Sequence, residues 1–297
     1  MPDGQGMLLK TDGSERIRYT DEVYPIYQRV DVVGVNGNPC VASHWHDDIE
    51  MSFIMEGRMW CDINGERVTL ETGDCVLINA RQLHRDQAPE GESCRYDTAI
   101  FHPSILTGAN PAVDLCVRRI VTHPCYPYDV FRAANAADRI LIEKVKTLML
   151  RVADPTPARL LGTVAAACEL LYALIPRLPE RSLGQRPDRH LSTVRAMTGF
   201  IQEHYAEKIT LADIARAGMI GERTVNTLFR KWFSETPLTY LTHYRLEKAA
   251  GLLESTDLPI TEIALDTGFS DANYFAICFR KQFAMSPTEY RNGRSGA

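Results

Sequence analysis

The sequence contains no pair of cysteines at the Cys-x-x-Cys spacing, although it has eight cysteines. They occur singly, at positions 40, 61, 75, 94, 116, 125, 168 and 278. Because zinc ribbons and thioredoxin-like redox sites depend on closely spaced pairs, this pattern argues against both. Isolated cysteines are typical of reduced thiols, which persist in a cytoplasm, and we therefore expect a cytoplasmic protein.

Signals for a membrane or for export are also missing. No apolar run approaches the roughly 20 residues that cross a bilayer. The first six residues, MPDGQG, lack the basic start and apolar stretch of a secretory signal, so we expect neither export nor a membrane partner. Hydrophobic residues make up 45% of the chain and charged residues 24%, as in ordinary globular proteins. A length of 297 residues favours two domains over one.

An excess of basic charge, the usual mark of a nucleic-acid binder, is absent as well. The chain has 33 Lys and Arg residues against 38 Asp and Glu residues, a formal net charge of −5. Residues 190–297 hold twelve of each sign, so the acidic excess belongs to the residues before them. A neutral C-terminal part would bind a polyanion with modest, salt-sensitive affinity, and dimerisation would supply the remainder.

What the sequence does contain is a helix-turn-helix pattern at residues 263–275. Ile263 lies on the apolar side of a first helix, and Gly268 can adopt the positive φ that ends it. Ser270 is expected to cap the second helix, with the Asp271 carboxylate in its first turn. Two short helices crossing at a tight turn are the arrangement that enters the major groove of DNA, although ordinary helical hairpins share it.

The pattern occurs twice, which favours the DNA-binding interpretation. The pentapeptide FRKWF at residues 229–233 recurs as FRKQF at residues 279–283, a shift of 50 residues. Pro237 and Tyr240 recur at the same shift, and the dipeptide Ile-Ala at residue 214 recurs at residue 263. A period of this size is one supersecondary unit used twice. Two such units could contact successive turns of one face of DNA, about 34 Å apart.

These repeated motifs resemble the AraC/XylS family of bacterial transcription regulators. The matching residues in the second unit are Ile263, Ala264, Gly268, Phe269, Ser270, Asp271, Tyr274, Phe275, Phe279, Arg280, Lys281, Ser286, Pro287, Tyr290 and Arg291. The resemblance covers residues 191–291 and implies a seven-helix domain in which a long helix joins two helix-turn-helix units. It implies a sequence-specific regulator and not an enzyme. The implied partners are double-stranded promoter or operator DNA, RNA polymerase and a second copy of the chain.

Positions carried over from the family predict the DNA contacts. In the first unit, base edges are expected to meet Arg223, Asn226 and Thr227, because Arg reads guanine, Asn reads adenine and Thr is less selective. The matching positions of the second unit hold Ala272, Asn273, Ala276 and Ile277. Ile277 departs from the Arg that is common in the family and can read only shape or a thymine methyl group, so the second unit is expected to act mainly as a clamp. Phosphate contacts, with solvated surface charge as the alternative, are expected from Arg230, Lys231, Arg280 and Lys281.

Residues 30–101 show short apolar stretches separated by turns. They predict strands at residues 30–35, 50–55, 59–63, 67–70, 75–78 and 98–101. Asn64-Gly65 is a two-residue hairpin signal, and a further turn is expected at residues 56–57. Strands of this length and spacing indicate a sandwich or a small barrel such as a jelly roll. The predicted fold class is therefore α+β, with an N-terminal β-barrel, accessory helices, and an all-α C-terminal domain holding two helix-turn-helix units.

One group of residues in this region resembles the first cupin motif, His-x-His-x3-Glu-x6-Gly: His44, His46, Glu50 and Gly57. On one continuous strand the imidazoles and the carboxylate would share a face. The second cupin motif is met only in part, by Gly73 and His84, because Asn79 and Arg81 stand where Pro and Gly are usual. The barrel is therefore expected to be cupin-like.

Two readings of these side chains remain open. Three imidazoles and one carboxylate suit a divalent transition metal, whose ligands would be His44, His46, Glu50 and His84. In the other reading they form the wall of an effector pocket, because the AraC-type resemblance implies a small effector, often a sugar, in this barrel. We assign effector binding to the same four residues and to Trp60, whose indole could stack on a sugar ring.

The alternative function is a cupin-type metalloenzyme or metal sensor that uses the same four ligands. The sequence leaves open the effector, the metal, the target genes and the operator, and whether the output is activation or repression.

The remaining segments are assigned from their periodicity. Residues 103–128 show no regular pattern, whereas residues 138–150 and 158–175 predict helices. The second of these helices is apolar on more than one face, which favours burial against the barrel and against a second copy of the chain. The expected organisation is an arm at 1–30, an effector-binding and dimerisation domain at 30–175, a Pro-rich linker at 176–190, and a DNA-binding domain at 191–297.

Overall fold

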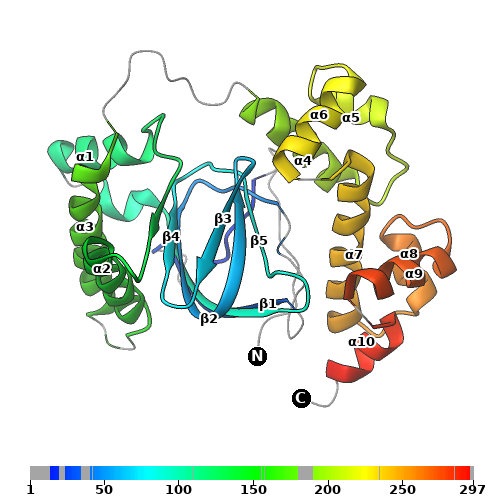
Figure 1. Cartoon of the computed structure of the whole chain (residues 1–297), viewed down its shortest axis with the longest axis horizontal. Coiled ribbons are helices and arrows are strands. Elements are labelled where there is room, and N and C mark those ends of the chain that lie inside the picture. Colours follow the sequence, from blue (N-terminus) through cyan, green and yellow to red (C-terminus); the bar gives the residue numbers. More distant parts are fainter. Residues whose placement is uncertain are drawn as a thin grey trace. The chain divides into compact units, whose positions relative to one another are not determined.

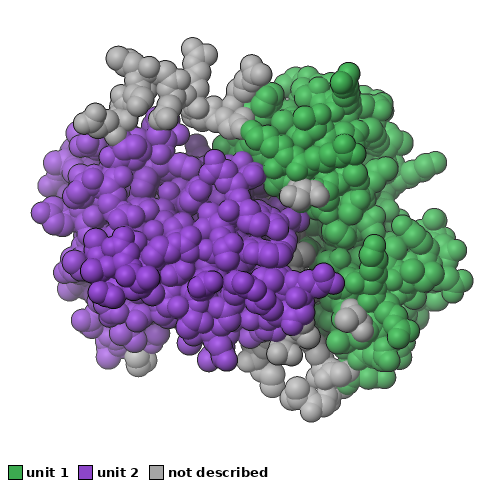
Figure 2. All heavy atoms as spheres, in the orientation of Figure 1, with its two compact units in different colours: residues 1–16, 190–297 green, residues 17–189 purple. Residues whose placement is uncertain are grey.

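The protein is described by a computed structural model, which covers residues 14–19, 24–34, 41, 43–108, 110–154, 156, 158–179, 190–233, 235–283 and 285–294. The chain divides into two compact units (Figure 2). Residues 17–189 form one unit, and residues 190–297 form the other together with residues 1–16. Most of the predicted linker lies outside the described residues.

The N-terminal unit, residues 17–189 and purple in Figure 2, is built on a seven-stranded antiparallel sheet. The strands are β1 (Ile26–Gly34), β2 (Ile49–Ile63), β3 (Glu66–Glu71), β4 (Cys75–Ile78), β5 (His84–Gln87), β6 (Ser93–Phe101) and β7 (Tyr128–Phe131). The order is β1-β6-β2-β4-β7, and β3 and β5 also pair with β2. The first part of β2 pairs with β4 and β6, and its last part pairs with β3 and β5. One long strand thus connects two layers that enclose a core, which confirms the predicted barrel-like β domain.

A bulge in β2 makes this switch possible. The register of β2 against β6 shifts between Ile54 and Glu56, and bulges of this kind bend a strand and increase its twist. Gly57 follows with φ +87, and a Cβ there would lie 2.1 Å from the Ser93 carbonyl oxygen. The sequence predicted two strands separated by a turn at this point. The structure corrects that to a single 15-residue strand, because the glycine serves close packing inside a bend and not a hairpin.

Helices cover one side of this sheet (Figure 1). They are the 3-10 turn η1 (Pro103–Leu106), α1 (Pro111–Val121), α2 (Ala136–Val152), α3 (Arg159–Leu174) and the 3-10 turn η2 (Ile175–Arg177). Met51, Leu77 and Phe101 of the sheet share one buried cluster with Val145 of α2 and Leu170 of α3. Both predicted helices are therefore confirmed. The region without a recognised pattern holds η1 and α1.

Two details of this unit depart from the sequence-based view. Arg177, expected in the linker, is ion-paired with Asp129 of β7 at 2.6 Å and with Asp138 of α2 at 2.9 Å, so the folded unit extends at least to this residue. Segment Arg159–Arg177 is also long and apolar enough, by length and composition alone, to cross a bilayer. Core helices of soluble proteins pass the same test, and the buried side of this one packs on α2 and the sheet.

The C-terminal unit is all-helical and contains seven helices among its described residues. They are α4 (Leu191–His204), α5 (Leu211–Ala217), α6 (Glu222–Phe233), α7 (Pro237–Ser255), α8 (Ile260–Asp266), α9 (Ala272–Phe283) and α10 (Pro287–Arg294). The long helix α7 lies between the group α4–α6 and the group α8–α10 (Figure 1). Tyr240, near the start of α7, contacts Phe229 of α6. Leu246 and Leu253, further along it, belong to the core that includes Phe275 of α9. The predicted architecture is confirmed.

The sequence repeat is a repeat of packing as well. Phe229, Phe233 and Tyr240 form a ring triad with centroid distances of 5.0–5.5 Å. Their counterparts fifty residues later are 4.3–5.3 Å apart: Phe279, Phe283 and Tyr290. Each helix-turn-helix turn also has the same backbone hydrogen bond. In the first it runs from the Ile220 amide to the Ala215 carbonyl, and in the second from the Phe269 amide to the Ala264 carbonyl. The two helix-turn-helix units are therefore copies of the same fold.

The helix caps follow the sequence with one correction. Thr210 and Asp213 form a capping box at the start of α5. At the start of α9, the Asp271 carboxylate accepts hydrogen bonds from the Asn273 and Tyr274 amides at 2.7 and 3.2 Å. Asp271 and not Ser270 is therefore the capping residue. The second helix-turn-helix turn is one residue longer than the first, so the capping residue of α9 lies one position later after the turn than the sequence repeat suggested.

The turn residues of the two units give a stability prediction. Met219 and Gly268 occupy matching positions, both with positive φ, at +52 and +86. A Cβ on Gly268 would lie 2.6 Å from the Tyr205 carbonyl oxygen and 2.8 Å from Nε of Arg245. Gly268→Ala should therefore destabilise the protein by about 2 kcal/mol or more. Met219 is 91% exposed, so Met219→Gly should relieve backbone strain without loss of packing and stabilise by up to about 1 kcal/mol.

Urea unfolding of the full chain, followed by the helical circular dichroism signal, checks both variants. An unchanged midpoint for Gly268→Ala would contradict the close contact.

Candidate effector and DNA-binding sites

Four residues of the cupin-like motif converge inside the N-terminal unit. His44 and His46 precede β2, Glu50 lies on β2, and His84 begins β5. One nitrogen of each imidazole and one Glu50 oxygen all lie within 4.8 Å of one another, and all four side chains are buried. The ring centroid of His84 lies 4.1 Å from that of His44 and 5.2 Å from that of His46. The structure thus brings together the four residues that the sequence singled out.

The convergence has a different origin from the predicted one. His44 and His46 do not lie on a continuous strand with Glu50, because the chain bends at Asp47 and Asp48. Instead, His44 forms an isolated antiparallel bridge with His84, whose two backbone hydrogen bonds are 2.9 and 3.0 Å long. The bridge, and not strand parity, places the imidazoles beside the Glu50 carboxylate.

Hydrogen bonds organise the cluster around one oxygen. Oε2 of Glu50 accepts from Nε2 of His46 and from Nε2 of His84, each at 3.1 Å. Nδ1 of His84 lies 2.9 Å from the Gln82 carbonyl oxygen. This backbone acceptor fixes the His84 ring so that Nε2 points into the cluster.

The electrostatics of the cluster follow from this geometry. Burial alone would lower the pKa of His84, but the facing Glu50 carboxylate raises it to about 9. Burial alone would raise the pKa of Glu50, but the charge on His84 and hydrogen bonds from both imidazoles hold that pKa well below its ordinary value. A carboxylate and an imidazolium therefore face each other inside the barrel, which is an arrangement that a cation can replace.

Three further polar residues beside the cluster were missed by the sequence reasoning. Asp48 lies 3.7 Å from Nδ1 of His46 and accepts a 2.7 Å hydrogen bond from the Tyr19 hydroxyl. Asp86 follows His84 by two residues on β5, so both side chains point to the same side of the strand. Burial and the Glu50 carboxylate raise the pKa of Asp86 to about 6. No sequence motif marks these residues. Strand β5 brings Asp86 to the cluster, and the bend at residues 47–48 brings Asp48 there.

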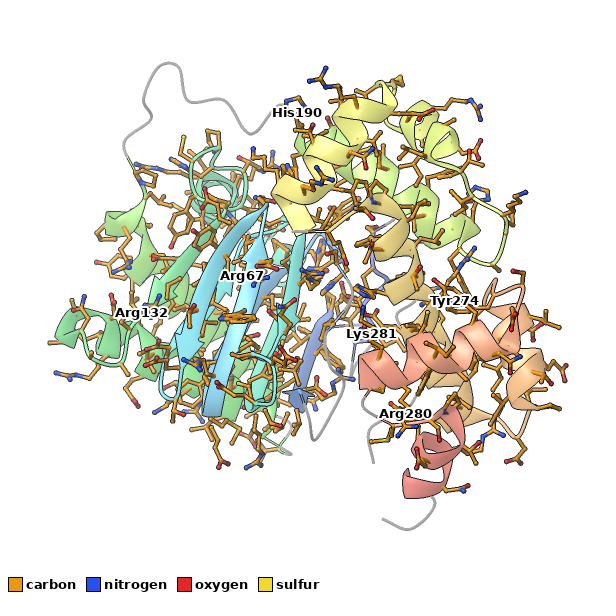
Figure 3. The ribbon with its side chains drawn as sticks, turned by 45° about the vertical axis from the view of Figure 1, so that its right-hand side comes forward. Arg67, Arg132, His190, Tyr274, Arg280 and Lys281 are labelled. Carbon is orange, nitrogen blue, oxygen red and sulfur yellow. The ribbon has the colours of Figure 1, made fainter. Side chains whose placement is uncertain are left out.

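Trp60 does not belong to this site. It lies between Met59 and Cys61 on β2, and both of these side chains are buried in the barrel core. Because neighbouring residues of a strand point to opposite faces, the Trp60 side chain lies on the outer face. There the Arg67 guanidinium stacks on its ring at 4.6 Å from the centroid, and Arg67 lies on β3 (Figure 3). This corrects the expectation that Trp60 contacts the effector, and the reason is the register shift at the β2 bulge.

The two candidate recognition helices, α6 and α9, present matching exposed faces. On α6, Thr227 is exposed and has exposed neighbours one turn away in both directions, namely Arg223, Thr224, Arg230 and Lys231. Asn226 is half-buried, and its amide nitrogen donates to the Glu222 carbonyl at 3.1 Å. Four of these side chains can therefore reach a groove directly. Asn226 must exchange its intrahelical hydrogen bond to do so, and Thr227 makes one as well, because its hydroxyl donates to the Arg223 carbonyl at 3.0 Å.

The corresponding face of α9 is centred on Ile277. Its exposed neighbours one turn away are Asn273, Tyr274, Arg280 and Lys281, while Ala272 and Ala276 are half-buried. Tyr274 lies toward the start of α9, and Arg280 and Lys281 toward its end (Figure 3). Tyr274, which the sequence reasoning did not place at the DNA, thus shares the face of the predicted contact residues.

Comparison with known proteins identifies a family for each half of the chain. A family described as "AraC-like ligand binding domain" matches residues 38–111, and one described as "Helix-turn-helix domain" matches residues 214–293. The chain is 26% identical over 264 residues to the uncharacterized HTH-type transcriptional regulator YdeC of Bacillus subtilis, covering 89% of this chain and 90% of that one. It is 30% identical over 259 residues to the HTH-type transcriptional activator RhaS of Escherichia fergusonii, covering 86% of this chain and 88% of that protein.

The chain belongs to the AraC family of helix-turn-helix transcription regulators. It is a DNA-binding regulator with a ligand-binding domain, as the motifs predicted. Among solved structures it is similar to an AraC-type DNA-binding regulator from Chromobacterium violaceum, at 27% identity over 35% of this chain and 92% of that one, with a TM-score of 0.34.

Membership of the AraC family also bears on the alternative function. The family matches and the relatives named above describe transcription regulators, and nothing in them supports a cupin-type metalloenzyme. The helix-turn-helix match spans α6 and α9, and the ligand-binding match spans His44, His46, Glu50 and His84.

Proposed function

We propose that this AraC-family protein is a cytoplasmic homodimer whose binding to operator DNA is controlled by a small effector held in the barrel. The duplication of the helix-turn-helix unit, with its repeated aromatic packing, carries the proposal. The relatives of the chain are transcription regulators, so we propose no enzymatic activity. As an operator-bound regulator it would act on RNA polymerase.

The faces of α6 and α9 divide the work of DNA binding. Arg223 stands in the first turn of α6, where a recognition helix commonly meets base edges, and its guanidinium can bind guanine bidentately. With it we assign Asn226 and Thr227 to bases. Arg230, Lys231, Arg280 and Lys281 lie in the last turns of their helices, where they would contact phosphate.

Arg223→Ala and Lys281→Ala test this division. Arg223→Ala should reduce the discrimination between the operator and a duplex with one altered guanine by about 1–3 kcal/mol. Lys281→Ala should weaken binding to both duplexes equally and reduce the dependence on salt by about one counterion. Fluorescence anisotropy with full-length protein measures both effects, and Arg119→Ala, an exposed arginine of α1, is the control. Loss of discrimination in Lys281→Ala but not in Arg223→Ala would refute the assignment.

We also propose that His44, His46, Glu50 and His84 hold a divalent transition metal in the barrel. The residues fit such an ion because three imidazoles and a carboxylate, all buried, offer ligand atoms within 4.8 Å of one another. The Gln82 carbonyl acts on the far side of the His84 ring, as outer partners of metal-bound imidazoles usually do. Nδ1 of His46 has no hydrogen-bond partner in the described part of the chain, and the Asp48 carboxylate lies 3.7 Å from it.

Such an ion would supply a Lewis-acidic position for an oxygen of the effector, such as a sugar hydroxyl. The four side chains would hold the ion, and Asp48 would orient His46 toward it. The metal sensor and the effector-controlled regulator are then the same protein, distinguished by whether the ion alone or a ligand on it is the signal.

Metal analysis of the purified full chain tests this site. We expect about one equivalent of metal in the wild type after loading with Zn²⁺ and dialysis, and an increase in the unfolding temperature on loading. Glu50→Ala and His84→Ala should abolish both, whereas His102→Ala, outside the cluster, should change neither. Metal that stays bound in the Glu50→Ala and His84→Ala proteins would exclude these ligands.

The homodimer is proposed from the exposed face of α3. Leu161, Ala165, Cys168 and Tyr172 are exposed and recur at spacings of four, three and four residues, which is the spacing of a two-helix seam. Glu169 next to this seam is paired with Lys144 of α2 at 3.2 Å, so the face is bordered by charge and does not suit a lipid surface. A second copy of α3 would cover it.

Leu161→Glu should therefore convert the dimer to a monomer, because a carboxylate would have to be buried in the seam. Sedimentation velocity of the full chain measures the change. Leu161 is 76% exposed and Leu115 on α1 is 71% exposed, so Leu115→Glu is a matched control that should leave the dimer intact. A Leu161→Glu protein that remains dimeric would place the interface elsewhere.

A further inference from the structure

The centre of the exposed face of α9 is apolar. Ile277 is 67% exposed, and its exposed neighbours one turn before and after it are Asn273, Tyr274, Arg280 and Lys281. The matching position of α6 is Thr227, and the two cations that follow it are the same in both helices. The two recognition helices therefore share their charged ends and differ in the chemistry of the centre.

A second apolar group enlarges this centre. Tyr274 stands three residues before Ile277, which places the two side chains side by side on the helix. Tyr274 is 56% exposed, so its ring adds apolar area to the same face of α9. The matching residue of α6 is Thr224, so the polar-to-apolar exchange occurs at both positions.

The major groove presents one apolar group of matching size, the C5 methyl of thymine. Ile277 has no hydrogen-bonding atom, so it cannot satisfy the donors and acceptors of a G·C pair, and a close approach would leave those atoms unpaired. Phosphate is equally excluded as its partner. Asn273, one turn earlier, can bind N6 and N7 of adenine, which is the base that pairs with thymine.

We propose that α9 reads an A·T step through the thymine methyl, with Ile277 as the contact residue, Tyr274 as the side of its pocket and Asn273 on the neighbouring adenine. This inference rests on the proposed DNA-binding function and assigns a sequence preference to its second unit. The protein then reads two chemically different half-sites: α6 binds guanine through Arg223, and α9 binds a methyl-bearing A·T step.

Deoxyuridine scanning tests the proposal, because replacing dT by dU removes only the methyl group. A duplex is first selected from a random library with the wild-type full chain, and each thymine is then replaced in turn. We expect the wild type to lose about fourfold in affinity at one or two positions, the equivalent of one buried methyl group. Ile277→Ala should bind the thymine duplex more weakly and show no further loss at those positions. Ile277→Gln, which keeps the reach but not the apolar surface, should behave in the same way.

Leu265→Ala is the matched control. Leu265 is 63% exposed and lies on α8, the first helix of the same unit, so its removal should leave the deoxyuridine profile of the wild type unchanged. We expect every variant to unfold at the same temperature as the wild type, because the substituted residues are exposed. Such a result excludes misfolding.

Two failures are distinguishable. If the wild type selects no duplex from the library, the DNA-binding function itself is wrong. If it selects one but no thymine methyl contributes, or the Ile277 variants keep the wild-type sensitivity, only the inference about α9 is overturned. Unchanged affinity of Ile277→Ala for the thymine duplex would likewise overturn it and would indicate that the apolar face serves a protein partner.

Discussion

Burial of two aromatic triads is the interaction on which the DNA-binding half of the molecule depends. Phe229 and Phe233 pack on Tyr240 to close α6 against α7. Phe279 and Phe283 do the same with Tyr290 to close α9 against α10. Rings at these distances bury a large area in a specific orientation, so each triad fixes the rotation of its recognition helix. The exposed faces of the two recognition helices are therefore oriented by buried residues.

A different constraint shapes the barrel, namely the high cost of burying charge. A lone carboxylate at the position of Glu50 would be strongly destabilising, and the imidazoles on either side compensate it. The cluster is thus a site in which the protein already holds opposite charges at metal-like spacing. A ligand or an ion that enters need only exchange partners, which makes binding and the internal electrostatics of the barrel one equilibrium.

Much of the fold could be predicted because the controlling signals are local. The bounds of α5 and α6 follow from caps and apolar spacing, and the tandem repeat identifies the architecture without any long-range information. Predictions failed where distant parts of the chain decide. Gly57 has the sequence of a turn but lies in a bulge against Ser93, and Trp60 changes face as a result. The His44–His84 bridge likewise depends on pairing across forty residues, which no local pattern encodes.

The family, the duplication and the identity of four buried ligand-type residues could be read from the chain alone, because each is a spacing along it. The surroundings of those residues depend on how distant segments pack. Strand register brought Asp86 toward the cluster and took Trp60 away from it, and helix packing exposed Ile277 at the centre of a recognition face. Register and packing set which side chains share a surface, and chemistry at a site depends on shared surfaces and not on order in the chain.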